Sequence, residues 1–420
     1  MLEYISLARL TLIKISQLIS LVKKSFSGIP PRIWLLSVIS LINRSGAMVI
    51  CFLTLYLTEN LHFTIEQAGY VMSSYGLGAI LGAFLGGKFT DLFGYRQVML
   101  LTLIGSGVLL LVAMSVSSFP MMCATLFVLN CFSEAFRPAS SVSIKVNSPE
   151  EIRARSFSLY RVFINLAISL ALILGGIIIG FGWKWIFICD SLSCFFAAAV
   201  LFFSHSQQSA EQEVADKPLR KKAHSGAYRD YDFLFFLFFT FLSAVAFMQI
   251  LWTVPAFFKQ VYGWSESKIG LVSAINGTVV MLIELPLIFL LEGKKRTIWL
   301  LRLGVFLYGL SYLILTFPPE YGMLWAVVYM VIISFGEIFV MPFSATWVTY
   351  RASAENEGAY MALYTMSYSI SNVVAPWIGT QVIAHQGFSS LWLLMAVVTL
   401  ISLSGFYWLE MRMKKESHQL

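Results

Sequence analysis

Charged side chains are scarce in this sequence. Asp, Glu, Lys and Arg make up 12% of its 420 residues, against about 25% in typical soluble proteins. Hydrophobic residues reach 58%, with 35 Phe, 18 Tyr and 11 Trp. A soluble fold has too little interior to hide so much apolar surface. The composition therefore predicts an integral membrane protein that has the lipid bilayer as its surroundings.

Sequence patterns of catalytic and metal centres are also missing. We find no Gly-Xaa-Ser-Xaa-Gly, His-Glu-Xaa-Xaa-His or P-loop pattern, so we expect neither an enzyme nor a bound cofactor. The five cysteines lie inside apolar runs without the spacing of zinc or redox sites. The five histidines lie in loops or near the ends of those runs. No metal site is therefore expected.

Long apolar runs dominate instead. Runs of about 20 apolar residues can cross a bilayer as helices, and we interpret twelve of them as spans. They cover residues 33–58, 66–87, 97–118, 120–142, 158–180, 183–203, 231–257, 268–291, 297–317, 321–347, 358–384 and 387–409. The polar stretch 204–230 separates two six-span units, 33–203 and 231–409. The sequence predicts an all-α membrane protein with twelve transmembrane helices in two six-helix halves.

The placement of positive charge predicts the orientation. Of the 29 Lys and Arg residues, all but four fall on the side that holds the N-terminus. The exceptions are Lys184, Lys259 and Lys268 on the other side and Arg44 within the first span. Basic residues concentrate on the cytoplasmic side of membrane proteins, so both termini are expected there. The net charge of +7 therefore reflects topology rather than a nucleic-acid partner.

Three polar segments complete the predicted organisation. Polar residues recur at near-helical spacing over residues 1–27 of the N-terminal segment 1–32, which predicts an amphipathic helix on the cytoplasmic leaflet, with an unstructured tail as the alternative. Residues 204–230 are expected to form a cytoplasmic linker and 410–420 a cytoplasmic tail. Short loops on the outer side favour the inner (plasma) membrane of a bacterium.

The two halves carry a similar stretch. Phe-Ser-Glu-Ala-Phe-Arg-Pro at 132–138, in the fourth span, resembles Phe-Gly-Glu-Ile-Phe-Val-Met-Pro at 335–342, in the tenth. The copies occupy the matching helix of each half, which indicates duplication of a six-helix unit. Parallel repeats with a site between them at mid-depth are an architecture of transporters.

One loop between spans supports a family resemblance. Residues 87–96 resemble the loop signature of the major facilitator superfamily through Gly87, Asp91, Gly94 and Arg96, although two basic positions of the signature are not basic here. The resemblance implies the major facilitator fold and a cytoplasmic gating role for this loop. It also implies a monomer.

Further stretches resemble bacterial multidrug-efflux-like, drug:proton antiporter members of the superfamily. They lie at residues 43–48, 134–138, 157–161, 273–277, 284–286 and 358–364. Such antiporters usually carry a Gly-Pro pair in the fifth span, where this chain has Ala171-Leu172. Antiport, symport and uniport therefore stay open.

Ionisable side chains inside the spans are the first candidates for a mechanism, because their insertion costs about 2.5–3.5 kcal/mol or more. The acids are Glu134, Glu284 and Glu337, which we take as proton-coupling candidates. Glu134 and Arg137 are three residues apart on one helix and are expected to form an ion pair. Glu337 has no base at the matching position, so it is expected to exchange protons, with helix-packing hydrogen bonds as the alternative role for Glu337 and Glu284. Arg44 is expected to neutralise it or to bind an anionic substrate.

Polar and aromatic side chains of the spans are the candidates for substrate binding, with helix packing as the alternative role for each. With Arg44, they are Asn43, Gln249, Trp252, Asn276, Tyr360, Tyr364 and Asn372. Aromatic rings around a cavity suit flat or amphipathic organic molecules.

The function predicted from these features is proton-coupled secondary transport of small organic molecules by alternating access. Efflux of drug-like or amphipathic compounds leads by resemblance. The alternative is a dedicated importer or exporter of one metabolite class, such as a sugar, an amino acid or peptide, a siderophore or an organic anion. A channel or a non-transporting membrane receptor is a remote third possibility.

Overall fold

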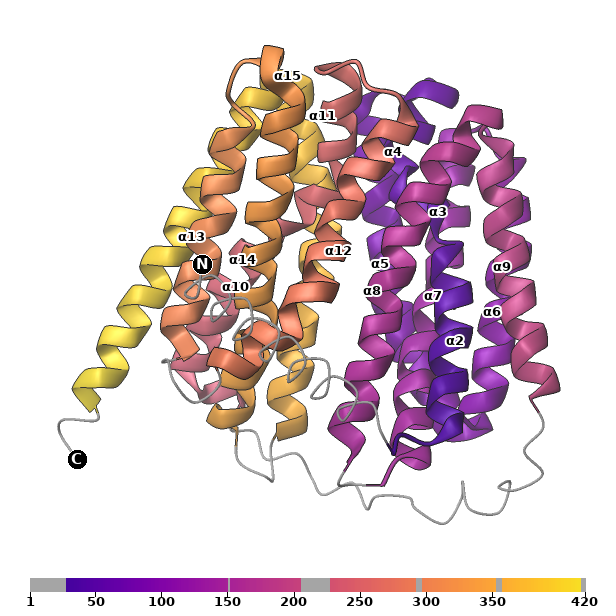
Figure 1. Ribbon diagram of the computed structural model, residues 1–420, viewed down its shortest axis with the longest axis horizontal. Helices are drawn as coiled ribbons and strands as arrows, with labels where there is room; N and C mark the ends of the chain where they lie inside the picture. The colour runs from indigo at the N-terminus through magenta and orange to yellow at the C-terminus, as the bar shows by residue number, and fades with distance from the viewer. Residues whose placement is uncertain (1–27, 150–151, 205–226, 292–296, 353–356, 417–420) are drawn as a thin grey trace, which may run out of the picture.

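The computed structural model describes residues 28–149, 152–204, 227–291, 297–352 and 357–416. Most of the predicted N-terminal segment and linker, and the end of the predicted tail, lie outside these residues. The described part is built from helices that run side by side in two halves (Figure 1). Ten helices are long and apolar enough to cross a membrane.

The first half, drawn in indigo to magenta, contains α2 to α9 (Figure 1). Its helices are α2 (Pro31–Ser45), α3 (Met48–Cys51), α4 (Leu53–Leu55), α5 (Ile65–Phe93), α6 (Tyr95–Met114), α7 (Phe119–Asn147), α8 (Arg153–Ile178) and α9 (Lys184–Phe203). The π-helical turn η1 (Tyr56–Asn60) follows α4, and the 3-10 turn η3 (Ile179–Phe181) follows α8.

The second half contains α10 to α15. Its helices are α10 (Tyr231–Trp252), α11 (Val254–Gln260), α12 (Glu266–Leu291), α13 (Thr297–Ile314), α14 (Gly322–Arg351) and α15 (Glu357–Glu416), with the 3-10 turns η4 (Ala227–Arg229) and η5 (Pro319–Tyr321). We call the end of the bundle where α9 ends and α10 begins the linker end. The end where α5 and α12 begin is the opposite end.

Twelve spans follow once two irregular helices are taken into account. The first span is divided into α2, α3 and α4, so no single piece has the length of a spanning helix. The element α15 contains two spans, because two helices meet at a kink at Gly387, whose φ of 82° lies in the left-handed region that glycine adopts readily. The predicted twelve-helix architecture in two halves is therefore confirmed.

Several helices are longer than the predicted spans. Helix α5 continues to Phe93 instead of stopping at residue 87, so Gly87 and Asp91 lie in its last turns and not in a loop. Only Gly94, with a φ of 84°, separates α5 from α6. Hydropathy identifies only the apolar middle of a helix. Backbone hydrogen bonds can continue the helix through polar residues beyond the membrane.

Candidate transport site

Contacts between the two halves concentrate toward the opposite end. The Ser73 hydroxyl of α5 donates to the Val373 carbonyl of α15 at 2.9 Å, and the Thr54 hydroxyl donates to the Trp252 carbonyl at 2.6 Å. On the other side of the interface, the Ser267 hydroxyl of α12 donates to the carbonyl of Gly176, which follows Gly175 near the end of α8, at 2.7 Å.

Glycines allow the helix backbones of the two halves to approach closely. A Cβ at Gly270 of α12 would overlap the Leu172 carbonyl of α8, and one at Gly76 of α5 would come within 2.9 Å of the Asn372 carbonyl of α15. At both positions, only a residue without a side chain lets the backbones come this close. The described contacts thus close the space between the halves at the opposite end.

Glu134 lies in a cluster of charges within the first half. Its carboxylate accepts a hydrogen bond from the Arg44 guanidinium at 3.1 Å and lies 3.6 Å from that of Arg137. Arg44, which the sequence left available for Glu337 or for an anionic substrate, pairs instead with Glu134, from 90 residues away in the sequence. Two bases therefore surround this acid.

Glu337 of α14, the matching acid of the second half, has different neighbours. Asn276 of α12 donates from its amide to the Glu337 carboxylate at 3.0 Å and to the Ser334 hydroxyl at 3.0 Å. Glu337 forms no salt bridge within 4.0 Å with the described residues. The Arg161 guanidinium acts on Glu337 electrostatically from beyond ion-pair distance. The two related acids thus differ in charge compensation, since Glu134 has two bases within 4 Å.

Glu284 forms an ion pair that joins the halves. The Arg161 guanidinium of α8 contacts the Glu284 carboxylate of α12. This contact lies nearer the linker end than the Ser73, Thr54 and Ser267 contacts described above. Arg161 was not among our predicted site residues, because its partner lies on a helix of the other half.

Gln249 and Trp252 of α10 are buried in helix contacts. The Gln249 amide donates to the Ala375 carbonyl at 2.9 Å, and its oxygen accepts from the Thr253 hydroxyl at 2.9 Å. The Trp252 ring meets the Tyr75 ring of the first half edge-on, with centroids 6.3 Å apart. The Gln249 amide is satisfied within the helix contacts, whereas the buried Trp252 indole N–H has no hydrogen-bond partner among the described residues. Substrate binding by these two residues stays a prediction.

Asn43, Tyr364 and Asn372 complete the predicted set. The Asn43 amide oxygen accepts a contact from the Cys194 thiol at 3.5 Å. The Tyr364 hydroxyl donates to the Met341 carbonyl at 3.3 Å, and the Asn372 amide donates to the Tyr368 carbonyl of its own helix at 3.5 Å.

Tyr360 belongs to a separate charge cluster at the linker end. Its hydroxyl donates to Asp230 at 2.8 Å, and Arg351 donates two further hydrogen bonds of 2.8 Å to the same carboxylate. Asp232 accepts from Arg351 at 3.2 Å and lies 3.0 Å from Arg412. This cluster fastens both ends of α15, the end of α14 and the start of α10 together.

Asp230→Asn is expected to destabilise the folded protein by about 1.5–3 kcal/mol, the range for hydrogen bonds to charged groups. Burial alone would raise the pKa of Asp230, but the hydrogen bonds from Arg351, Tyr360 and the Phe233 amide outweigh it and hold the pKa below its usual range. Asn still caps a helix well, so this variant removes the charge and keeps the cap of α10.

The difference in melting temperature between wild type and Asp230→Asn, measured in detergent, should depend on pH. A lowered pKa in the folded state stabilises above the unfolded value of about 3.9, and this stabilisation is lost as the pH falls through the folded value. The difference should be full at pH 6 and shrink below about pH 4. A difference that stays constant over this range would contradict the assignment.

The predicted gating residues lie at the linker end of the first half. The Arg96 guanidinium donates to the carbonyl groups of Leu201 and Phe202 at 3.4 and 3.1 Å, which ties the start of α6 to the end of α9. Asp91 is exposed on the last turns of α5. We keep a gating role for this segment as a hypothesis.

Asp190 of α9 is a buried acid that the sequence analysis missed. It is 6% exposed and lines a cavity of about 50 Å³ with Arg44, Asn43 and Tyr75. The Val49 amide, near the start of α3, donates to its carboxylate. The rule that singles out ionisable residues inside spans would have found it. Its position also accounts for the broken first span, because it satisfies an amide that the break leaves free.

Comparison with known families agrees with this architecture. The Major Facilitator Superfamily family model matches residues 33–376, most of the chain. The chain belongs to the major facilitator superfamily. It is a multi-pass integral membrane protein and a secondary transporter of small molecules, not an enzyme.

Similar transporters of the superfamily extend over nearly the whole length of this one. A Na(+), Li(+), K(+)/H(+) antiporter of Planococcus maritimus is 24% identical over 88% of this chain and 92% of its own. The uncharacterized MFS-type transporter YqjV of Bacillus subtilis strain 168 is 24% identical over 94% of this chain and 98% of its own.

Solved structures of major facilitator proteins share the fold. The nucleoside transporter NupG, in one variant, superposes with a TM-score of 0.78 at 12% identity, over 90% of this chain and 99% of that one. A POT family transporter bound to a thioalcohol-conjugated peptide superposes with a TM-score of 0.75 at 16% identity, over 90% and 96%. At such identities the likeness shows the fold alone.

Proposed function

We propose that this transporter is proton-coupled and exports drug-like or amphipathic small molecules by alternating access. One observation carries the proposal: Glu337 lies within a span with an uncharged amide at 3.0 Å, whereas its counterpart Glu134 has two arginines. An acid inside the membrane without a base at ion-pair distance is ionised only at a high free-energy cost, so it is suited to take up and release a proton during the transport cycle. The proton-coupled antiport named for the Planococcus maritimus relative supports this reading.

The proposed topology places the linker end in the cytoplasm, with both termini there, in a bacterial inner membrane. The distribution of Lys and Arg along the sequence supports this orientation. With contacts between the halves gathered at the opposite end, the structure would then represent the state closed toward the outside. The Arg161–Glu284 ion pair must break or rearrange if the halves rock against each other. We propose a monomer as the working unit.

A dedicated carrier of one metabolite class is the second candidate. Ala171 and Leu172 stand where the efflux antiporters usually have a Gly-Pro pair. The fold that this chain shares with a nucleoside transporter is compatible with a specific organic cargo. Either cargo would enter between Glu337 of the second half and the Arg44–Glu134 pair of the first.

Everted membrane vesicles with an acid interior and a pH-sensitive dye test the proposal. Efflux substrates should collapse the pH gradient in vesicles that contain the protein and not in vesicles without it. The panel should include varied drug-like compounds, single metabolite classes, and the chlorides of Na⁺, K⁺ and Li⁺. A response to one metabolite class alone would favour the second candidate, and a response only to the salts would make the cargo an alkali cation. No response, with the protein present in the membrane, would contradict export by proton antiport.

A further inference from the structure

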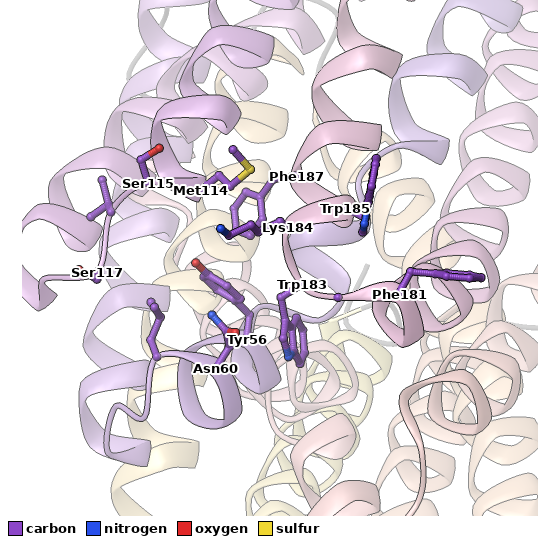
Figure 2. Close-up of a pocket in the computed structure, with 13 residues that line it drawn as sticks. Tyr56, Asn60, Met114, Ser115, Ser117, Phe181, Trp183, Lys184, Trp185 and Phe187 are labelled. Carbon is purple, nitrogen blue, oxygen red and sulfur yellow. The ribbon is translucent and has the colours of Figure 1, made fainter.

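A pocket of about 440 Å³ opens at the opposite end of the first half (Figure 2). Its wall is made of the ends of the turn η1 with Leu61, residues 114–117 at the end of α6, and residues 181–185 and 187 from the end of η3 to the first turn of α9. Because α8 and α9 both span the membrane, the turn that joins them lies at the membrane surface. The pocket is thus at the boundary of lipid and water, apart from Glu337 and the Arg44–Glu134 pair.

Three hydrogen-bond donors without a partner among the described residues point into this pocket. Figure 2 shows the Lys184 ammonium, the Tyr56 hydroxyl and the Asn60 amide on one side of it. Tyr56 is only 3% exposed, and no hydrogen-bond partner of these three side-chain groups is found among the described residues. None of the residues that line the pocket is acidic. Lys184 and Asn60 are exposed and only Tyr56 is buried. An unpaired ammonium beside two neutral donors, with no carboxylate in the lining, suits an anion.

Lys184 differs from the other lysines predicted on this side of the membrane. The Lys259 ammonium lies 2.6 Å from the Glu266 carboxylate, and the Lys268 ammonium lies 4.2 Å from the centroid of the Trp264 ring. Within the described ranges, Lys184 has no such contact. Its charge is therefore available to a ligand.

Aromatic rings surround the donors and extend toward lipid. The Tyr56 ring packs on Trp183 and Phe187, with centroids 5.7 and 4.8 Å apart. Trp185 and Phe181 are 51% and 78% exposed on the pocket rim. Trp is enriched where lipid headgroups meet acyl chains, and rim rings of this kind contact both parts of a lipid.

The π-helical turn η1 is the local device that assembles the donors. It covers Tyr56–Asn60, so both donors of this segment lie at its ends. Such widened turns are rare and occur frequently at functional sites. A regular α-helical turn would orient the two side chains differently relative to Lys184.

We propose that this pocket binds the headgroup of an anionic phospholipid from the leaflet opposite the linker end. Lys184 contacts the phosphate, Tyr56 and Asn60 donate hydrogen bonds to its oxygens, and Trp185 and Phe181 contact the upper part of the acyl chains. All walls of the pocket come from one half. The site therefore persists when the halves move, and it is independent of proton coupling.

Native mass spectrometry of the purified full chain, titrated with short-chain phosphatidylglycerol or phosphatidylcholine, tests the proposal. Wild type should retain one phosphatidylglycerol at a concentration at which phosphatidylcholine is lost. Lys184→Gln should weaken the binding of phosphatidylglycerol by about tenfold or more, the scale of a charged hydrogen bond. Lys268→Gln is the matched control, and it should bind as wild type does. Tyr56→Phe keeps the packed ring and should show a smaller loss.

Three outcomes would overturn the proposal. The first is equal affinity for the two lipids, and the second is an unchanged affinity in Lys184→Gln. The third is glycerol phosphate binding as tightly as the lipid, which would make the ligand a soluble phosphate ester. Melting temperatures in the same detergent separate loss of binding from loss of fold, since Lys184 is exposed and its replacement should leave the temperature unchanged.

Discussion

Glu337→Gln is expected to reduce gradient-driven transport to background while exchange of cargo across the membrane continues. A glutamine amide has nearly the shape of the carboxyl group, and its oxygen can still accept the 3.0 Å hydrogen bond from Asn276. It cannot take up or release a proton, so the cargo loses its link to the proton gradient. Proteoliposomes with an imposed pH gradient measure the first activity, and cargo exchange without a gradient measures the second.

Two variants sharpen this prediction. Glu337→Asp keeps a titratable carboxyl group and should retain coupled transport at a lower rate. Glu284→Gln distinguishes the two acids, because Glu284 is paired with Arg161. Wild-type gradient-driven rates in Glu337→Gln would remove Glu337 from the mechanism. If Glu284→Gln alone lost coupling, the proton site would be at the ion pair between the halves.

Arg44→Leu is expected to lower the free energy of unfolding by about 3 kcal/mol, the lower end of the range for removing one partner of a buried ion pair. The Arg44 and Glu134 side chains are 25% and 19% exposed, which favours this lower end. The variant leaves Glu134 with Arg137, which is 3.6 Å away and 67% exposed. Thermal unfolding in detergent micelles measures the loss.

The double variant Arg44→Leu, Glu134→Leu is the control for charge. Replacing both partners removes the unpaired carboxylate, and apolar residues can replace buried ion pairs at little cost. The double variant should therefore be more stable than Arg44→Leu alone. Equal or lower stability of the double variant would show that the loss comes from packing of the arginine and not from an uncompensated acid.

Much of the local pairing near the repeated stretch followed from the sequence. Glu134 and Arg137 are three residues apart on one helix, so their proximity was predictable from helical geometry, and the structure places them 3.6 Å apart. The Arg44–Glu134 contact joins α2 and α7, and Arg44 lies in the last turn of α2, just before a break in the first span that hydropathy does not reveal. Asp190 was visible in the sixth span and was overlooked.

The predicted substrate residues separated in ways that only three-dimensional packing could decide. In the structure, Asn276 donates a hydrogen bond to Glu337 of α14, whereas Tyr360 donates one to Asp230 at the linker end. Both were polar or aromatic side chains in apolar runs and looked alike in one dimension. The difference arises from helix rotation and tilt, which depend on every neighbouring helix.

The sequence by itself determined the spans, the two halves and the bias of positive charge between the two sides. These features follow from the free energy of placing each residue in lipid. A charged side chain in the hydrocarbon core is costly, and each span must satisfy its own backbone hydrogen bonds there. Tertiary structure alone decided which charges meet. Arg161 reaches Glu284 of the other half, and Glu337 meets an amide instead of a base. These partners lie 61 and 123 residues apart in the sequence. They are chosen by how helices pack, and no local pattern records that choice.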